Sequence, residues 1–159
     1  MKRLFLTITV VLGLFLSINA QDFSYEEYCE KVTTEVDKFT GDTTHVSPYL
    51  RTQMYFCKLV KTDKVLTWVS VSVRSSTHSI GKGIYLLLDN GETISRPTKR
   101  VKASYSSGTY RNSSSIILTE DEIQLLKEHN ITAVRLYIHD ADIKKPEQYR
   151  GYINCIDNK

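Results

Sequence analysis

A long alternation of apolar and polar side chains constrains the fold more than any other feature of this chain. Val65, Thr67, Val69, Val71 and Val73 recur at every second position. β-Branched residues with a period of two are typical of a strand with one buried face and one open face. Because such a strand needs neighbouring strands and a layer that covers its apolar face, the chain is expected to build a sheet.

Runs before and after this alternation supply neighbouring strands. Met54–Lys61 is rich in apolar residues, and the short link Thr62–Lys64 to the next strand suits a hairpin. Ile84–Asp89 is followed by Asn90-Gly91, the pair preferred in a type I′ turn because both residues tolerate positive φ. Pro97 is expected to end the returning strand or to place it at an edge of the sheet, because proline cannot donate to the ladder.

The most complete helix signals surround Thr119. Thr119 and Glu122 have the spacing of a capping box, and Leu118 and Ile123 have that of a hydrophobic staple. Asn130 suits a left-handed helix end. A second capping box, Ser24 to Glu27, predicts a short helix followed by a strand that reaches Phe39.

After this helix, Ile131–His139 is expected to form one strand with Arg135, Tyr137 and His139 on its polar face. Pro146 then starts a short helix, with a terminal strand as the alternative because of Gly151. The whole pattern predicts an α+β fold: a mostly antiparallel β meander, as an open barrel or sheet, with one well-capped helix before the last strand and a short C-terminal helix.

Residues 1–20 have the composition of a cleavable signal peptide. Lys2 and Arg3 precede the apolar run Leu4–Ile18, and Ala20 marks the expected cleavage site. The alternative, a membrane anchor, needs about 20 apolar residues, more than this run offers. We therefore expect residues 21–159 to be one exported, soluble domain, periplasmic or secreted, with no transmembrane segment after cleavage.

Removal of this segment changes the charge balance. The chain has 21 basic and 18 acidic residues; without Lys2 and Arg3, 19 basic residues remain and the net charge falls from +3 to +1. A nearly neutral domain gives no compositional reason to expect a nucleic-acid partner. Arg96, Lys99, Arg100 and Lys102 do form a local basic cluster, which either binds a polyanion or protects a solvated hairpin edge.

The three cysteines allow at most one internal disulfide. Cys29, Cys57 and Cys155 permit three pairings, and the sequence does not choose among them. All three also suit the role of small buried apolar residues.

The chain contains no established catalytic, nucleotide-binding or metal-binding motif, so no cofactor and no metal are predicted. Two hypotheses for a cryptic hydrolase-type enzyme remain, one with His139, Asp140 and Asp142 as acid–base groups and one with Cys57 as the nucleophile. A third role, as a structural or assembly component of the cell envelope, rests on export alone.

The favoured interpretation is an exported, non-catalytic module that binds a protein, a peptide or a glycan. Aromatic and cationic side chains on the polar faces of two strands would form its binding patch if those faces are adjacent. The candidate residues are Trp68, Arg74, Arg135, Tyr137 and His139.

Four segments carry a resemblance to a known group of proteins. They are Asp37–Gly41, Gly81–Leu87, the block from Leu118 through Tyr137, and Tyr152–Cys155. In these segments, and in their order from about residue 34 to the end, the chain resembles small exported proteins of unknown function that are common in Bacteroidetes-type bacteria. The resemblance implies a location in the cell envelope and carries over no functional residue.

Overall fold

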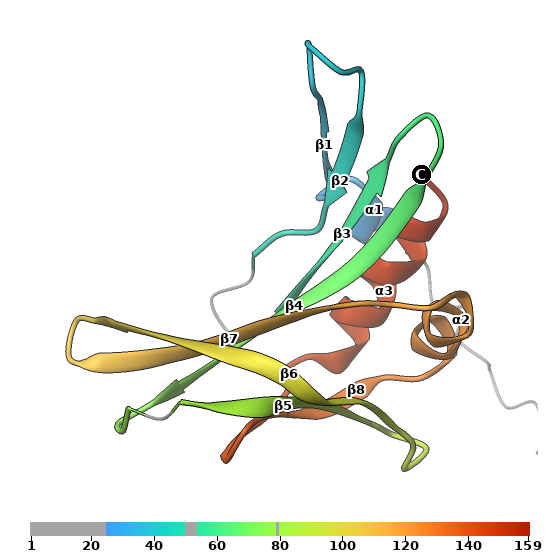
Figure 1. The fold of residues 1–159 in the computed structure, drawn as a ribbon. Coiled ribbons are helices and arrows are strands. Elements are labelled where there is room, and N and C mark those ends of the chain that lie inside the picture. Colours follow the sequence, from blue (N-terminus) through green and yellow to red (C-terminus); the bar gives the residue numbers. More distant parts are fainter. Residues whose placement is uncertain (1–24, 50–53, 79) are drawn as a thin grey trace, which may run out of the picture.

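The computed structural model describes residues 25–49, 54–78 and 80–159 (Figure 1). The expected signal peptide and the Ser24 helix cap lie outside these residues, so both stay predictions. Within the described part of the chain there are three helices and nine strands. They are α1 Glu26–Cys29, β1 Thr33–Val36, β2 Thr43–Val46, β3 Met54–Val60, β4 Val65–Ser75, β5 Gly81–Leu88, β6 Thr93–Ser106, β7 Thr109–Ile117, α2 Glu120–Glu128, β8 Ile131–Leu136, β9 His139–Asp142 and α3 Pro146–Asp157.

The strands form one antiparallel sheet that is curled but not closed. Its order is β1-β2-β3-β4-β7-β6-β5-β8-β9, and β4 also approaches β8 and β9 across the concave side. The expectation of a mostly antiparallel, β-rich fold with helices is confirmed. A simple meander is wrong, because β4 pairs with β7 rather than with β5. The chain crosses to β5 after Ser75, and β5, β6 and β7 then return strand by strand to β4.

Pro97 neither ends its strand nor lies at an edge. β6 continues past it for nine further residues, pairing with β5 and then with β7. The register jumps between Ile84↔Arg96 and Lys82↔Arg100, so Pro97, Thr98 and Lys99 bulge out of the ladder. A bulge tolerates the missing N–H of proline, and it bends β6 between the two halves of the sheet.

The hairpin at Asn90-Gly91 differs from the expected type I′ turn. Gly91 has a φ of 87°, whereas Asn90 is not among the residues with positive φ. The Leu88 N–H donates to the Glu92 carbonyl, and the Gly91 N–H donates to the Leu88 carbonyl. This pattern fits a three-residue loop with a type I turn and a left-handed glycine.

The core lies on the concave side of the sheet, under α3. Phe56 and Ile84 from the sheet are fully buried there, as are Tyr149, Ile153 and Ile156 from α3. Figure 1 shows α3 crossing this side of the sheet behind β3 and β4, with α1 beside it. Burial of this apolar surface is the main source of stability for a fold of this size.

Two contacts join the first and last helices. Cys29 and Cys155 form a disulfide whose Cα atoms are 5.1 Å apart, which leaves Cys57 as a buried free thiol. Gly151 lies against the Tyr28 ring, where a Cβ atom would overlap the ring carbons. Gly151 made a terminal strand the alternative prediction from the sequence. In the structure it lies within the helix and allows α1 and α3 to approach closely.

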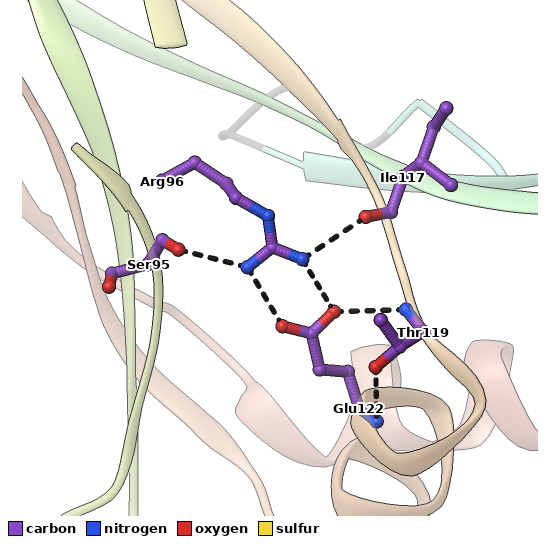
Figure 2. A network of polar contacts seen from close by, with 5 residues as sticks. All are labelled: Ser95, Arg96, Ile117, Thr119 and Glu122. Atoms are coloured by element: carbon purple, nitrogen blue, oxygen red, sulfur yellow. Dashed lines mark hydrogen bonds and ion pairs between the residues drawn. The ribbon is translucent and has the colours of Figure 1, made fainter. Parts of the chain in front are cut away.

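The capping box expected at the start of α2 is present and belongs to a larger network (Figure 2). The Glu122 N–H donates to the Thr119 hydroxyl, and the Thr119 N–H donates to a Glu122 carboxylate oxygen. Arg96 from β6 donates to both oxygens of Glu122, at 2.9 and 2.8 Å, and to the Ser95 and Ile117 carbonyls. Arg96 thereby joins α2 to the sheet. Because Glu122 pairs with its charge, Arg96 does not act together with the other three residues of the predicted basic cluster.

The other end of α2 differs from the prediction. His129 follows the helix in an extended conformation, and Asn130 is not left-handed. Instead, the backbone and side-chain N–H groups of Asn130 donate to the Asp89 carboxylate, at 3.1 and 2.8 Å. Two hydrogen bonds to the β5–β6 hairpin, which is distant in sequence, thus hold the end of α2 in place of a left-handed cap.

The expected strand Ile131–His139 is two strands. β8 ends at Leu136, and Tyr137 adopts a left-handed φ of 58° that reverses the chain into β9. His139 then pairs with Leu136, and Asp140 pairs with Arg135. Ile138, which a single strand would place on the same face as Val134 and Leu136, is exposed at this turn.

No helix in the described ranges is long and apolar enough to cross a bilayer.

Candidate functional site

The structure does not bring the five predicted binding residues together. Trp68 and Arg74 lie on the outer face of β4, six residues and about 20 Å apart along the strand. Arg135, Tyr137 and His139 lie on β8, its turn and β9, and three strands separate β8 from β4 in the sheet. β4 and β8 are therefore not neighbours in the sheet. β4 does approach β8 and β9 elsewhere in the fold, but Trp68 and Arg74 are on its outer face.

Each residue of the second group has its own local environment. Arg135 donates to both oxygens of Asp140, at 2.6 and 2.7 Å, on the exposed surface. The Tyr137 ring lies against Gly81, where a Cβ atom would overlap it. His139 is half-buried in β9, so the polar face expected for Arg135, Tyr137 and His139 does not form.

The acid–base hypothesis gains no support from this geometry. His139 and Asp140 are consecutive in a strand and so point to opposite faces, whereas Asp140 and Asp142 share one face. Hydrogen bonds from Arg135 hold the pKa of Asp140 below its ordinary value. In the described part of the chain, no three carboxylate, histidine or cysteine side chains gather as metal ligands would.

The Cys57 hypothesis gains no support either. Cys57 is buried beside its cross-strand partner Trp68, and burial raises the pKa of its thiol to about 11. A thiol of this kind stays protonated at neutral pH and is a poor nucleophile.

A large hollow lies on the outer face of the sheet, where β3, β4 and β7 meet the segment after β2. It has a volume of about 720 Å³, and no helical residue of the described ranges lines it. We call it the serine groove, after the hydroxyl side chains on its floor. The residues that define it are Tyr49, Tyr55, Ser70, Ser72, Arg111, Ser113 and Ser115.

Alternation places these side chains outward. In β4 the apolar positions point to the core, so Ser70 and Ser72 point out; in β7, Asn112, Ser114 and Ile116 are buried, so Ser113 and Ser115 point out. The pairing of β4 with β7 sets Ser70 opposite Ser115, and their hydroxyl oxygens are 2.8 Å apart. The floor is thus a row of small hydrogen-bonding groups.

Two tyrosines and an arginine form the wall of the groove. The rings of Tyr49 and Tyr55 meet edge to face with centroids 5.6 Å apart, and the Arg111 guanidinium carbon lies 5.6 Å from the centroid of the Tyr49 ring. The Tyr49 hydroxyl is 3.2 Å from the Ser72 hydroxyl. These contacts hold aromatic surface beside the hydroxyl floor.

Two smaller hollows with basic walls share lining residues with the groove. One, of about 350 Å³, lies between Arg74 and Arg111. The other, of about 290 Å³, is lined by Lys99, Arg100 and Lys102 together with Ser113–Ser115. Three members of the predicted basic cluster therefore lie next to the serine groove.

Of the five predicted binding residues, only Arg74 lines one of these hollows. The alternation in β4 puts Ser70 and Ser72 on the same face as Arg74, but sequence reasoning missed Tyr49, Tyr55 and Arg111. The alternation of Arg111, Ser113 and Ser115 was the available signal for β7. That signal shows which side chains share a face, but not that β7 pairs with β4.

No protein-family model, curated protein or solved structure matches this chain.

Proposed function

We propose that this chain is an exported, non-catalytic module that binds a glycan chain in the serine groove. The observation that carries the proposal is the juxtaposition of aromatic rings with a row of hydroxyl groups on a sheet face that no described helix covers. Sugars offer apolar C–H faces and hydroxyl groups, so they bind well where aromatic surface and small hydrogen-bonding groups lie side by side.

The volume of the groove also suits a ligand. A hollow of about 720 Å³ falls within the range of roughly 300–1,000 Å³ that is common for ligand sites. A peptide added to an edge strand is less well supported, because the edges β1 and β9 have only four residues each.

A glycan array with the purified protein, followed by calorimetry on the best oligosaccharide, tests the proposal. Tyr49→Ala removes the ring that contacts both Tyr55 and Arg111, and we expect it to weaken binding at least tenfold. Tyr105→Ala is the matched control, because Tyr105 is another exposed tyrosine but lies on the opposite face of the β6–β7 hairpin. Binding that Tyr49→Ala leaves intact, or an array without any bound glycan, would contradict the proposal.

A further inference from the structure

We infer that the ligand of the serine groove is an anionic glycan, and that Arg74 and Arg111 bind its acidic group. This inference rests on the proposed function and adds a ligand class to it. It begins with the register of β4 and β7, in which Arg74 and Arg111 are direct cross-strand partners.

Two arginines in this position repel each other. Directly opposite residues of an antiparallel pair have Cβ atoms about 4.5–5.5 Å apart, and like charges at that spacing destabilise a sheet. Among the residues that the structure describes, neither arginine forms an ion pair with a carboxylate. The hollow of about 350 Å³ between them is open to a ligand that would supply the missing negative charge.

Two other arginines of the sheet differ from this pair. Arg96 has a bidentate carboxylate partner in Glu122, and Arg135 has one in Asp140. A carboxylate of the chain itself therefore balances the charge of each of these two arginines. Arg74 and Arg111 stand out because they face each other and have no such partner in the described chain.

Acidic residues are missing from the strands that form the floor of the groove and its side hollows. Residues 93–117, which make up β6, β7 and their turn, contain five basic residues and no aspartate or glutamate. Between β3 and β7 the only acidic residues are Asp63, Asp89 and Glu92, and all three lie in hairpin turns. The groove and its two side hollows therefore present a positive surface on a chain whose expected mature net charge is close to zero.

Arg111 connects the sugar site to the anion site. Its side chain lines both the serine groove and the hollow beside Arg74, and its guanidinium lies over the Tyr49 ring. Stacking on a ring orients the planar guanidinium, which then offers paired N–H donors to a carboxylate or a sulfate. One ligand can therefore lay its sugar ring on the hydroxyl floor and its acidic group between the two arginines.

A single-stranded nucleic acid fits this surface less well. Such ligands need successive aromatic faces on which bases stack. Of the described residues that line the groove, only Tyr49 and Tyr55 have aromatic rings, and these meet edge to face rather than forming a row of parallel faces. The experiment must therefore distinguish binding of an oligonucleotide from binding of an anionic glycan.

Calorimetry with matched ligand pairs tests the inference. The probes are hexagalacturonate and its fully methyl-esterified form, dextran sulfate and plain dextran of the same length, and a deoxythymidine oligonucleotide of matched charge. We expect at least tenfold tighter binding of one acidic glycan than of its neutral counterpart. The carboxylated and sulfated probes show which acidic group is preferred.

Variants locate the charge requirement. Arg74→Gln should weaken binding of the acidic glycan at least tenfold and leave binding of the neutral glycan unchanged, because Arg74 lines only the side hollow. Arg111→Gln should also weaken binding of the acidic glycan at least tenfold, and Arg111→Lys should restore part of that loss. Lys144→Gln removes one charge from an exposed site before α3, and it should have no effect beyond a small general one.

Each other outcome overturns a defined claim. Equal binding of acidic and neutral glycans would end the inference but leave the proposed function intact. Tighter binding of the oligonucleotide than of the acidic glycans would show that the ligand of the serine groove is a nucleic acid rather than a glycan. If none of the probes binds, and the array is also empty, the proposed function fails together with the inference.

Discussion

The two faces of β4 present opposite chemistry on the same eleven residues. Its inner face places Val69, Val71 and Val73 in the core under α3, whereas its outer face places Ser70, Ser72 and Arg74 in or beside the open groove. The inner face can be explained by folding alone, since burial of apolar surface stabilises the sheet. The outer face includes two arginines that repel each other and that folding does not need. This difference favours a role in binding for the outer face.

The comparison is sharpest at two consecutive residues of β3. Phe56 points inward and is 0% exposed, whereas Tyr55 points outward into the groove. We expect Phe56→Ala to lower the free energy of unfolding by about 4 kcal/mol, because it leaves a cavity in the core. Tyr55→Ala should cost only about 1 kcal/mol, because its side chain is only partly buried. Urea unfolding of both variants measures the difference, and similar losses of stability would remove the distinction between the faces.

The disulfide on the inner side is the next largest contribution. Cys29 and Cys155 are 126 residues apart in the chain, and a bridge that closes so long a loop restricts the unfolded state strongly. Its removal in Cys155→Ser should cost about 3 kcal/mol. Thermal unfolding should show a lower Tm for the wild type and for Cys57→Ala when a reductant is added, but no further change for Cys155→Ser. If the reductant lowered the Tm of Cys155→Ser but not that of Cys57→Ala, the bridge would include Cys57, and its assignment to Cys29 and Cys155 would be wrong.

The network at Arg96 and Glu122 should contribute less, because the arginine is about one-third exposed. We expect Glu122→Gln to lower the free energy of unfolding by about 1–2 kcal/mol at pH 7, since glutamine retains the cap but loses the ion pair.

This contribution should depend on pH. Burial acts to raise the pKa of Glu122, but hydrogen bonds from Arg96 and Thr119 outweigh it and hold the pKa below its ordinary value of 4.5. A carboxylate with a lowered pKa stabilises the fold above its unfolded value, and this stability is lost as the pH falls through the folded value. The difference between wild type and Glu122→Gln should therefore shrink as the pH falls below 4.5. A constant difference in urea unfolding from pH 7 to pH 3 would contradict this account.

The smallest expected effect on stability belongs to the outer face. Arg74→Gln removes one member of the like-charge pair with Arg111, so the free energy of unfolding should stay the same or rise by up to about 0.5 kcal/mol. Low ionic strength should enlarge the gain, because less salt screens the repulsion. A clear loss of stability in urea unfolding would show that Arg74 serves the fold, and the contrast between the faces would then fail at this residue.

Local signals in the sequence anticipated much of the sheet but less of the site. The hairpin between β3 and β4 and the capping box of α2 follow from short-range spacing. The turn at Tyr137 was missed because a tyrosine with positive φ gives no compositional sign. The bulge at Pro97 was missed because a proline in a long strand usually marks its end or an edge.

The alternation at Val65–Val73 by itself determined that β4 would have one buried and one open face, and which side chains each face would carry. The tertiary structure alone decided which strand would lie beside it. A period of two specifies the face of a side chain but not its partner strand, and the partner of β4 proved to be β7 rather than the next strand in the chain. That pairing placed Ser70 opposite Ser115 and Arg74 opposite Arg111, and so it assembled the groove from residues that are 37–45 positions apart.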